Sequence, residues 1–134
     1  MCIGTAHVWS VFEELEGDYT SLDEKILYLS QCFNEMYKHK HSVIFIGDTN
    51  LMGDGETMQA LEKAALNTLG ISDVGAKKAV ATWDGIVNKT QIRHRERHRP
   101  DRLLVKGITG NVSVDIVHVN ERSDHYAISA TVAC

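Results

Sequence analysis

The sequence predicts a single α/β domain, with a mixed β-sheet and two main helices, over residues 1–134. Strand-like and helix-like periodicities alternate along the chain without internal repeats or low-complexity tracts, which is typical of α/β architecture. The hydrophobic content of 43% is sufficient to build a core, and the length suits one compact domain. These properties also exclude a disordered tail.

Two segments have the periodicity of amphipathic helices. The first begins after Ser21, which lies three residues before Glu24 and predicts a capping box, and the helix continues to about residue 39. Apolar residues recur on one of its faces: Leu22, Ile26, Leu29, Phe33, Met36 and Tyr37. The second helix spans residues 56–69, and Gly70 is placed to end it in the left-handed conformation. Its predicted apolar side comprises Met58, Leu61, Ala65 and Leu69.

Several short runs are predicted to be strands. Residues 42–46 show no polar alternation, as expected of a strand that is covered on both faces. Residues 112–119 alternate apolar side chains with Ser113 and Asp115, which predicts a strand with one wet face. The segment 75–100 is predicted to be mostly loop. The other predicted strands are residues 2–5, 71–74, 79–83, 102–106 and 127–132.

Composition and charge exclude several classes of protein. The net charge of −4 leaves no general basic surface for nucleic acid, so any phosphate binding must be local. The three cysteines are widely spaced, which argues against a zinc ribbon and against a secreted disulfide framework. The sequence contains neither a run apolar enough to span a bilayer nor a recognisable export signal at its amino terminus. We therefore expect an intracellular protein, cytoplasmic or nuclear, with no membrane span.

Three short motifs at the ends of strand-like runs carry chemically active side chains. Strand ends can bring residues that are distant in the sequence into one polar pocket. Three carboxylates, an amide and an imidazole suit an oxygen-ligated divalent cation with an acid/base histidine beside it, which is the equipment for cleaving a phosphate ester. The motifs are Gly47-Asp48-Thr49-Asn50, Arg99-Pro100-Asp101-Arg102 and Ser123-Asp124-His125-Tyr126.

In this order the three motifs resemble those of the endonuclease/exonuclease/phosphatase superfamily of metal-dependent phosphodiesterases. Gly-Asp-Thr-Asn-Leu at 47–51, Thr-Trp-Asp at 82–84 and Arg-Pro-Asp-Arg at 99–102 are most similar to the 5′-tyrosyl-DNA phosphodiesterase branch. The resemblance covers nearly the whole chain but corresponds to the second half of the family's domain. It implies half of a four-layered α/β sandwich, in a partial domain that lacks the first half with its asparagine and metal-binding glutamate.

The resemblance assigns catalytic and metal-binding roles to five residues. Asp48 would polarise the attacking water or a metal, and Asn50, two positions further on, would face the same way and bind the phosphate. His125 would stabilise the transition state or act as an acid/base, with Asp101 holding its other ring nitrogen. Asp124 and Asp48 would bind the cation, Mg²⁺ or Mn²⁺.

The resemblance implies further substrate contacts. His7, in Thr5-Ala6-His7-Val8, matches a second phosphate-facing histidine of the family and is a further predicted catalytic residue. Trp83 matches a position near the substrate groove, where an indole can stack on a base. Arg102 and Asn50 are the other predicted substrate-binding residues, and the arginine would contact a phosphate.

Each motif also has a structural interpretation. Asp48 and Asn50 could form an ordinary Asx turn, Asp101 and Arg102 could form a surface ion pair, and Trp83 could be a core residue. Two functions therefore stay open. The first is a divalent-metal-dependent phosphodiester hydrolase, nuclease or tyrosyl-DNA phosphodiesterase-like, that needs its N-terminal half. The second is an inactive remnant that acts as a binding or interaction module.

The expected half-domain also predicts a partner. One face of its sheet would normally lie against the other half, so that a large exposed apolar face is expected here. Such a face would favour association with a partner chain or with a second copy of this chain. The other predicted partner is a phosphodiester substrate, such as a nucleic acid.

Overall fold

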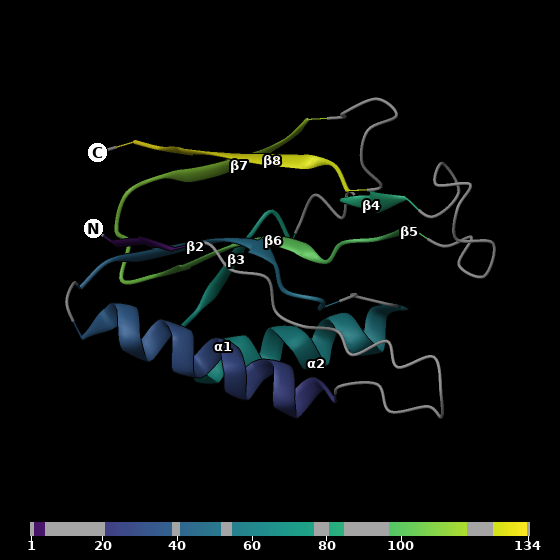
Figure 1. Cartoon of the computed structure of the whole chain (residues 1–134), viewed down its shortest axis with the longest axis horizontal. Helices are drawn as coiled ribbons and strands as arrows, with labels where there is room; N and C mark the ends of the chain where they lie inside the picture. Colours follow the sequence, from purple (N-terminus) through teal and green to yellow (C-terminus); the bar gives the residue numbers. More distant parts are fainter. Residues whose placement is uncertain are drawn as a thin grey trace.

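The described elements form three layers, with helices α1 and α2 on one face of a four-stranded sheet and the β7–β8 ribbon on the other (Figure 1). The computed structural model describes residues 2–4, 21–38, 41–51, 55–76, 81–84, 97–117 and 125–133. The elements are β1 (Cys2–Gly4), α1 (Leu22–Tyr37), β2 (Val43–Asp48), α2 (Gly55–Thr68), β3 (Ser72–Val74), β4 (Trp83–Asp84), β5 (Arg97–His98), β6 (Asp101–Lys106), β7 (Val112–Val117) and β8 (Ala127–Val132).

Helix α1 begins at the predicted capping box. The Ser21 hydroxyl accepts a hydrogen bond from the Glu24 amide, and the Glu24 carboxylate accepts from the Ser21 amide at 2.7 Å. These hydrogen bonds, the backbone one first, lower the pKa of Glu24 from its ordinary value of 4.5. Leu29 and Phe33 are buried on the predicted face, and Leu22, Ile26, Met36 and Tyr37 pack beside them. The prediction for α1 is therefore confirmed.

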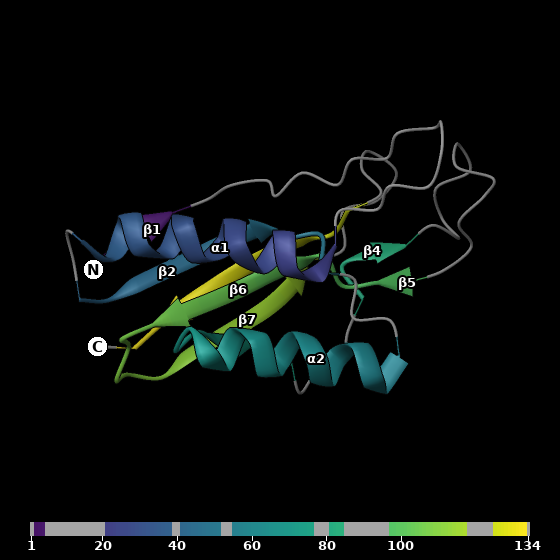
Figure 2. The same cartoon turned by 90° about the horizontal axis from the view of Figure 1, so that it is seen from below.

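Helix α2 lies beside α1 on the sheet, as Figure 2 shows, but it turns a different side to the core from the one predicted. Met58 and Leu61 are 38% and 50% exposed, whereas Glu62 is 3% exposed and Leu66 is buried. The predicted apolar side is therefore wrong at its first two residues. The physical reason is that a buried arginine partner makes Glu62 a core residue.

The end of α2 follows the sequence. Gly70 adopts a φ of 67°, which a residue without a side chain accepts at little cost and which stops the helix as predicted. No helix in the described segments has the length and apolar character needed to cross a membrane.

The main sheet has the strand order β1-β2-β6-β3 and is mixed, because β1 runs parallel to β2 while the other neighbours are antiparallel. Successive residues of β2 and β6 point to opposite faces. On the helix side, Val43, Phe45 and Leu104 join the core beneath α1 and α2. On the other side, Ile44 and Leu103 pack against the ribbon. Strand β2 is thus covered on both faces, as predicted.

The β7–β8 ribbon covers the second face of the sheet. Val114 is buried in the core with Val105, while Ser113 and Asp115 are exposed, so that the predicted wet face of β7 is confirmed. The expected large exposed apolar sheet face is not supported by the described residues, because this ribbon occupies it. The predicted half of a four-layered sandwich is not confirmed in that detail, and the described segments form three layers: the helices, the main sheet and the ribbon (Figure 1).

Strands β4 and β5 form a short second antiparallel pair, with Trp83 opposite His98. The predicted strand at 79–83 is correspondingly shorter, since residues 81 and 82 are not in a strand and 79–80 lie outside the described residues. Strand β5 was not predicted, because the segment 75–100 is charged and lacks apolar periodicity. This pair lies at the end of the main sheet where the candidate site is found (Figure 1).

Candidate active site

Asp48 and Asp101 are direct cross-strand partners at the ends of β2 and β6. Both lie on the face opposite α1 and α2, because each is an even number of residues from Ile44 or Leu103. Directly opposed residues in an antiparallel pair have their Cβ atoms about 4.5–5.5 Å apart. Two carboxylates at this separation repel each other unless a cation, a proton or a hydrogen-bond donor lies between or beside them.

His125 supplies such a donor. Its Nδ1 atom lies 2.8 Å from Oδ2 of Asp101, with side chains that are 34% and 14% exposed respectively. The ring is placed by its backbone: His125 forms an isolated antiparallel bridge with Trp83, and the amide of Tyr126 donates to the carbonyl of Thr82 at 2.7 Å. Because Nδ1 faces Asp101, Nε2 on the opposite edge of the ring is directed away from it. The predicted Asp101–His125 contact is present.

Thr82 connects the segments that carry these residues. Its hydroxyl accepts from the amide of Asp101 at 3.0 Å, its amide donates to the carbonyl of His98 at 2.9 Å, and its carbonyl holds Tyr126. Thr82 is buried, and the backbones of β4, β5, β6 and the segment before β8 therefore converge at one point. Sequence analysis included Thr82 in the Thr-Trp-Asp motif but gave it no role, because its contacts are with residues 16 or more positions away.

The segment after Asp48 is a tight turn. Asn50 has a φ of 49°, and its amide donates to Oδ1 of Asp48 at 2.8 Å, so that the Asx turn suggested by the sequence is present. Thr49 donates to the carbonyl of Pro100 through both its amide and its hydroxyl, each at 2.8 Å. The turn is compatible with the site, because it engages one oxygen of Asp48 while Asp48 remains the cross-strand partner of Asp101.

Three of the predicted residues form a group that can hold a metal ion. One ligand atom from each of Asp48, Asp101 and His125 lies within 4.8 Å of the other two. In this group the two carboxylates would be the ligands of Mg²⁺ or Mn²⁺, because Nδ1 of His125 carries the proton that it donates to Asp101. These cations favour oxygen ligands and complete their shells with water or substrate oxygens. Sequence analysis assigned the metal to Asp48 and Asp124, whereas the described residues bring Asp101 and His125 to Asp48.

The remaining predicted site residues are placed as follows. His7 and Asp124 lie outside the described residues, and their roles stay predictions. Asn50 is 5% exposed. Trp83 is 9% exposed and stacks on His98, with 5.3 Å between ring centroids, which agrees with its interpretation as a core residue. A substrate base would reach only the small exposed part of its ring.

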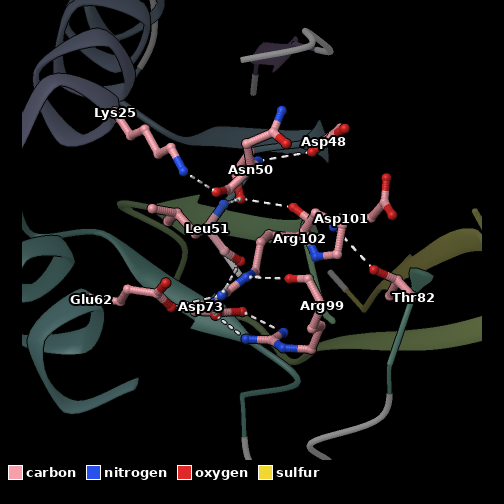
Figure 3. A network of polar contacts seen from close by, with 12 residues as sticks. Lys25, Asp48, Asn50, Leu51, Glu62, Asp73, Thr82, Arg99, Asp101 and Arg102 are labelled. Carbon is pink, nitrogen blue, oxygen red and sulfur yellow. Dashed lines mark hydrogen bonds and ion pairs between the residues drawn. The ribbon is translucent and has the colours of Figure 1, made fainter. Parts of the chain in front are cut away.

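Arg102 lies on the other face of the sheet from Asp101, as alternation in β6 requires. It is 4% exposed, and its guanidinium donates to Asp73 at 2.6 Å, to Glu62 at 2.7 Å and to the carbonyl of Leu51 at 2.6 Å. Figure 3 shows these contacts on the side of the strand away from the carboxylate of Asp101. This placement does not support the predicted substrate contact of Arg102, and it excludes a surface ion pair with Asp101.

Solved structures share this fold. Truncated Caenorhabditis elegans TDP2 matches with a TM-score of 0.64 and 21% identity over 98% of this chain and 54% of that chain. Beta toxin 275-280 from Staphylococcus aureus matches with a TM-score of 0.70 and 16% identity over 96% of this chain and 51% of that one. Danio rerio TDP2 complexed with single strand DNA product matches with a TM-score of 0.61 and 19% identity over 97% and 54%.

These structures have the fold of the endonuclease/exonuclease/phosphatase superfamily, and the resemblance seen in the three motifs is confirmed at the level of the fold. This chain spans about half the length of each of the three. No protein-family model matches the sequence, and no curated protein does.

Proposed function

We propose that this chain forms the phosphate-facing part of a divalent-metal-dependent phosphodiester hydrolase, nuclease or tyrosyl-DNA phosphodiesterase-like, that uses Mg²⁺ or Mn²⁺. The observation that carries the proposal is the convergence of Asp48, Asp101 and His125, from three segments of the chain, within 4.8 Å. The shared fold supports it, and a neighbour in complex with single strand DNA product supports a nucleic acid as the substrate.

The chain's own residues would divide the work between them. Asp101 holds Nδ1 of His125 at 2.8 Å, which orients the ring and directs Nε2 away from Asp101, and Nε2 would donate to a phosphate oxygen or to the leaving group when substrate is bound. Asp48 presents a carboxylate next to this pair, and Asn50, which is 5% exposed, would reach the phosphate only through the small exposed part of the residue. A bound divalent cation would offset the negative charge that develops on the phosphate.

A complementary segment would complete the site. Since the chain spans about half the length of its structural neighbours, we infer that further ligands and part of the substrate groove come from residues beyond those of the fold seen here, in the same polypeptide or in a partner chain. A phosphate bound at Asp48 and His125 would then lie between the two parts. This arrangement is typical of sites formed at the interface of two packed units.

The second candidate is a binding module without catalysis. The burial of Asn50 and Trp83 favours it, because substrate atoms reach a side chain poorly when less than a tenth of the residue is exposed. The two candidates differ in a measurable way. A binding module would retain affinity for a divalent cation or a phosphodiester but would not turn it over.

The test combines the full chain with the complementary half of a homologous enzyme and measures Mg²⁺-dependent hydrolysis of a nitrophenyl phosphodiester. We expect His125→Ala to lower turnover by a factor on the order of 10² to 10⁴. His41→Ala, at an exposed histidine before β2, is the matched control and should leave turnover unchanged. Turnover that survives both His125→Ala and removal of the divalent cation would refute the proposal.

A further inference from the structure

Lys25 reaches from the start of α1 to the turn beside the candidate site. Its Nζ atom lies 2.6 Å from the carbonyl oxygen of Asn50, a contact between residues 25 positions apart. Figure 3 shows the lysine side chain extended toward this carbonyl from the helix side. The contact is to backbone, so that it acts on the shape of the turn instead of on a substrate atom.

Asn50 has an unusual backbone. Among the described residues it is the one non-glycine residue with a positive φ, at 49°. L-residues disfavour this left-handed region, although asparagine tolerates it better than most, and the surroundings must hold it there. The hydrogen bond from its amide to Asp48 acts on one side of the residue, and Lys25 acts on the other.

A second cation holds the next peptide group. Nη2 of Arg102 donates to the carbonyl of Leu51 at 2.6 Å, while the same guanidinium is anchored by Glu62 and Asp73. Two successive carbonyls of the turn thus accept hydrogen bonds from charged donors, one on α1 and one on β6. Hydrogen bonds to charged groups are stronger than neutral ones, so these contacts fix the path of the turn.

We propose that Lys25 is a positioning residue for the candidate active site: by holding the Asn50 carbonyl, it keeps Asn50 left-handed and its amide directed at Asp48. This inference rests on the proposed function for its catalytic meaning, although its structural part stands without it. If the carbonyl is released, Asn50 relaxes toward negative φ and its backbone amide turns away from Asp48. The directions of the Asp48 carboxylate and of the Asn50 backbone amide are then no longer fixed.

The test compares Lys25→Met with Lys25→Arg and with Lys38→Met in the full chain. Lys38 lies at the other end of α1 and pairs with Glu35 at an exposed site, which makes it a matched control. The first measurement is hydrogen exchange of the Asn50 amide, together with its HN–Hα coupling, which reports φ. We expect exchange to be about tenfold faster in Lys25→Met, in keeping with the loss of a charge-assisted hydrogen bond. Lys25→Arg should restore part of the protection, and Lys38→Met should leave it unchanged.

The second measurement is turnover of the complemented protein. Lys25→Met should lower kcat with little change in KM, because the turn is misdirected while substrate contacts remain. Unchanged exchange and coupling at Asn50 would overturn the proposal whatever the kinetics. A raised KM with unchanged Asn50 exchange would also overturn it, by showing a direct phosphate contact. If the unsubstituted protein shows no turnover, exchange at Asn50 still decides the positioning role, and only the proposed function fails.

Discussion

Oδ2 of Asp101 lies 2.8 Å from Nδ1 of His125, although Asp101 begins a strand of the main sheet and His125 precedes β8 of the ribbon. The pair therefore joins the two sheets at the point where their shared core ends. Its geometry depends on the packing of Ile44, Leu103 and Val114 beneath it. The candidate site is thus coupled to the contact between sheet and ribbon.

Replacing Asp101 by Asn should lower turnover of the complemented protein by a factor on the order of 10² to 10⁴, because the neutral amide no longer orients and stabilises the charged form of His125. Asp115→Asn changes an exposed carboxylate on β7 and is the control. Steady-state kinetics with a nitrophenyl phosphodiester measure the effect. Equal activity of the two variants would mean that the Asp101–His125 contact has no part in catalysis.

Asp48→Asn should weaken binding of Mn²⁺ to the chain roughly ten- to a hundredfold, as expected for the loss of one unit charge close to a partly exposed cation. Titration followed by the paramagnetic signal of free Mn²⁺ measures the affinity, and this experiment does not depend on catalysis. Asp115→Asn again serves for comparison. Binding that is the same in all three proteins would place the cation elsewhere.

Arg102→Met should reduce the free energy of unfolding by about 3–5 kcal/mol, because it leaves Glu62 buried without its cation, while Asp73 keeps its ion pair with Arg99. Denaturant unfolding followed by circular dichroism provides the value. The double variant Arg102→Met with Glu62→Leu removes the orphaned charge of Glu62 and should recover part of the loss. A single variant as stable as the parent would show that the network contributes little.

Ser21→Ala should destabilise the protein by about 1 kcal/mol, the usual cost of removing an N-cap side chain. The pKa of Glu24 should also rise part of the way toward its ordinary value, because the hydrogen bond from the Ser21 hydroxyl is lost while the larger effect of the backbone amide remains. Because the pKa of Glu24 is lowered in the folded state, ionised Glu24 contributes to the stability of the fold. This contribution to stability is complete above the ordinary pKa of Glu24 and disappears as the pH falls through the pKa of the folded state. An NMR titration of Glu24 that is identical in parent and variant would contradict this account.

Sequence analysis located both helices and the faces of α1, β2 and β7, but not the face that α2 turns to the core. The capping box at Ser21 and the left-handed Gly70 fix helix boundaries through local geometry, which short stretches of sequence contain. The face of α2 depends on a partner 40 residues away, because Glu62 is buried only through its bond with Arg102. Periodicity of apolar residues cannot reveal such a pair, and Met58 and Leu61 were assigned to the core in its place.

In the candidate site, too, local sequence patterns identified some residues, whereas roles that depend on distant contacts were missed. Asp48, Asp101 and His125 were identified because their motifs lie at strand ends, where side chains gather. Alternation along β6 was also enough to place Asp101 and Arg102 on opposite faces, yet both were assigned to the site. The contribution of Lys25 depends on a tertiary contact with a backbone carbonyl, and a lysine on a helix surface carries no signal of it.

Because Asp101 lies on the main sheet and His125 precedes β8 of the ribbon, their contact also depends on the order in which the parts of the fold open or unfold. The ribbon contributes one side of the smaller core, whereas α1, α2 and the main sheet form the larger one. Partial opening of the ribbon would separate His125 from Asp101 while the helices remain intact. Under rising denaturant, the hydrolysis proposed for the complemented protein would therefore decline at a lower denaturant concentration than the helical circular dichroism signal.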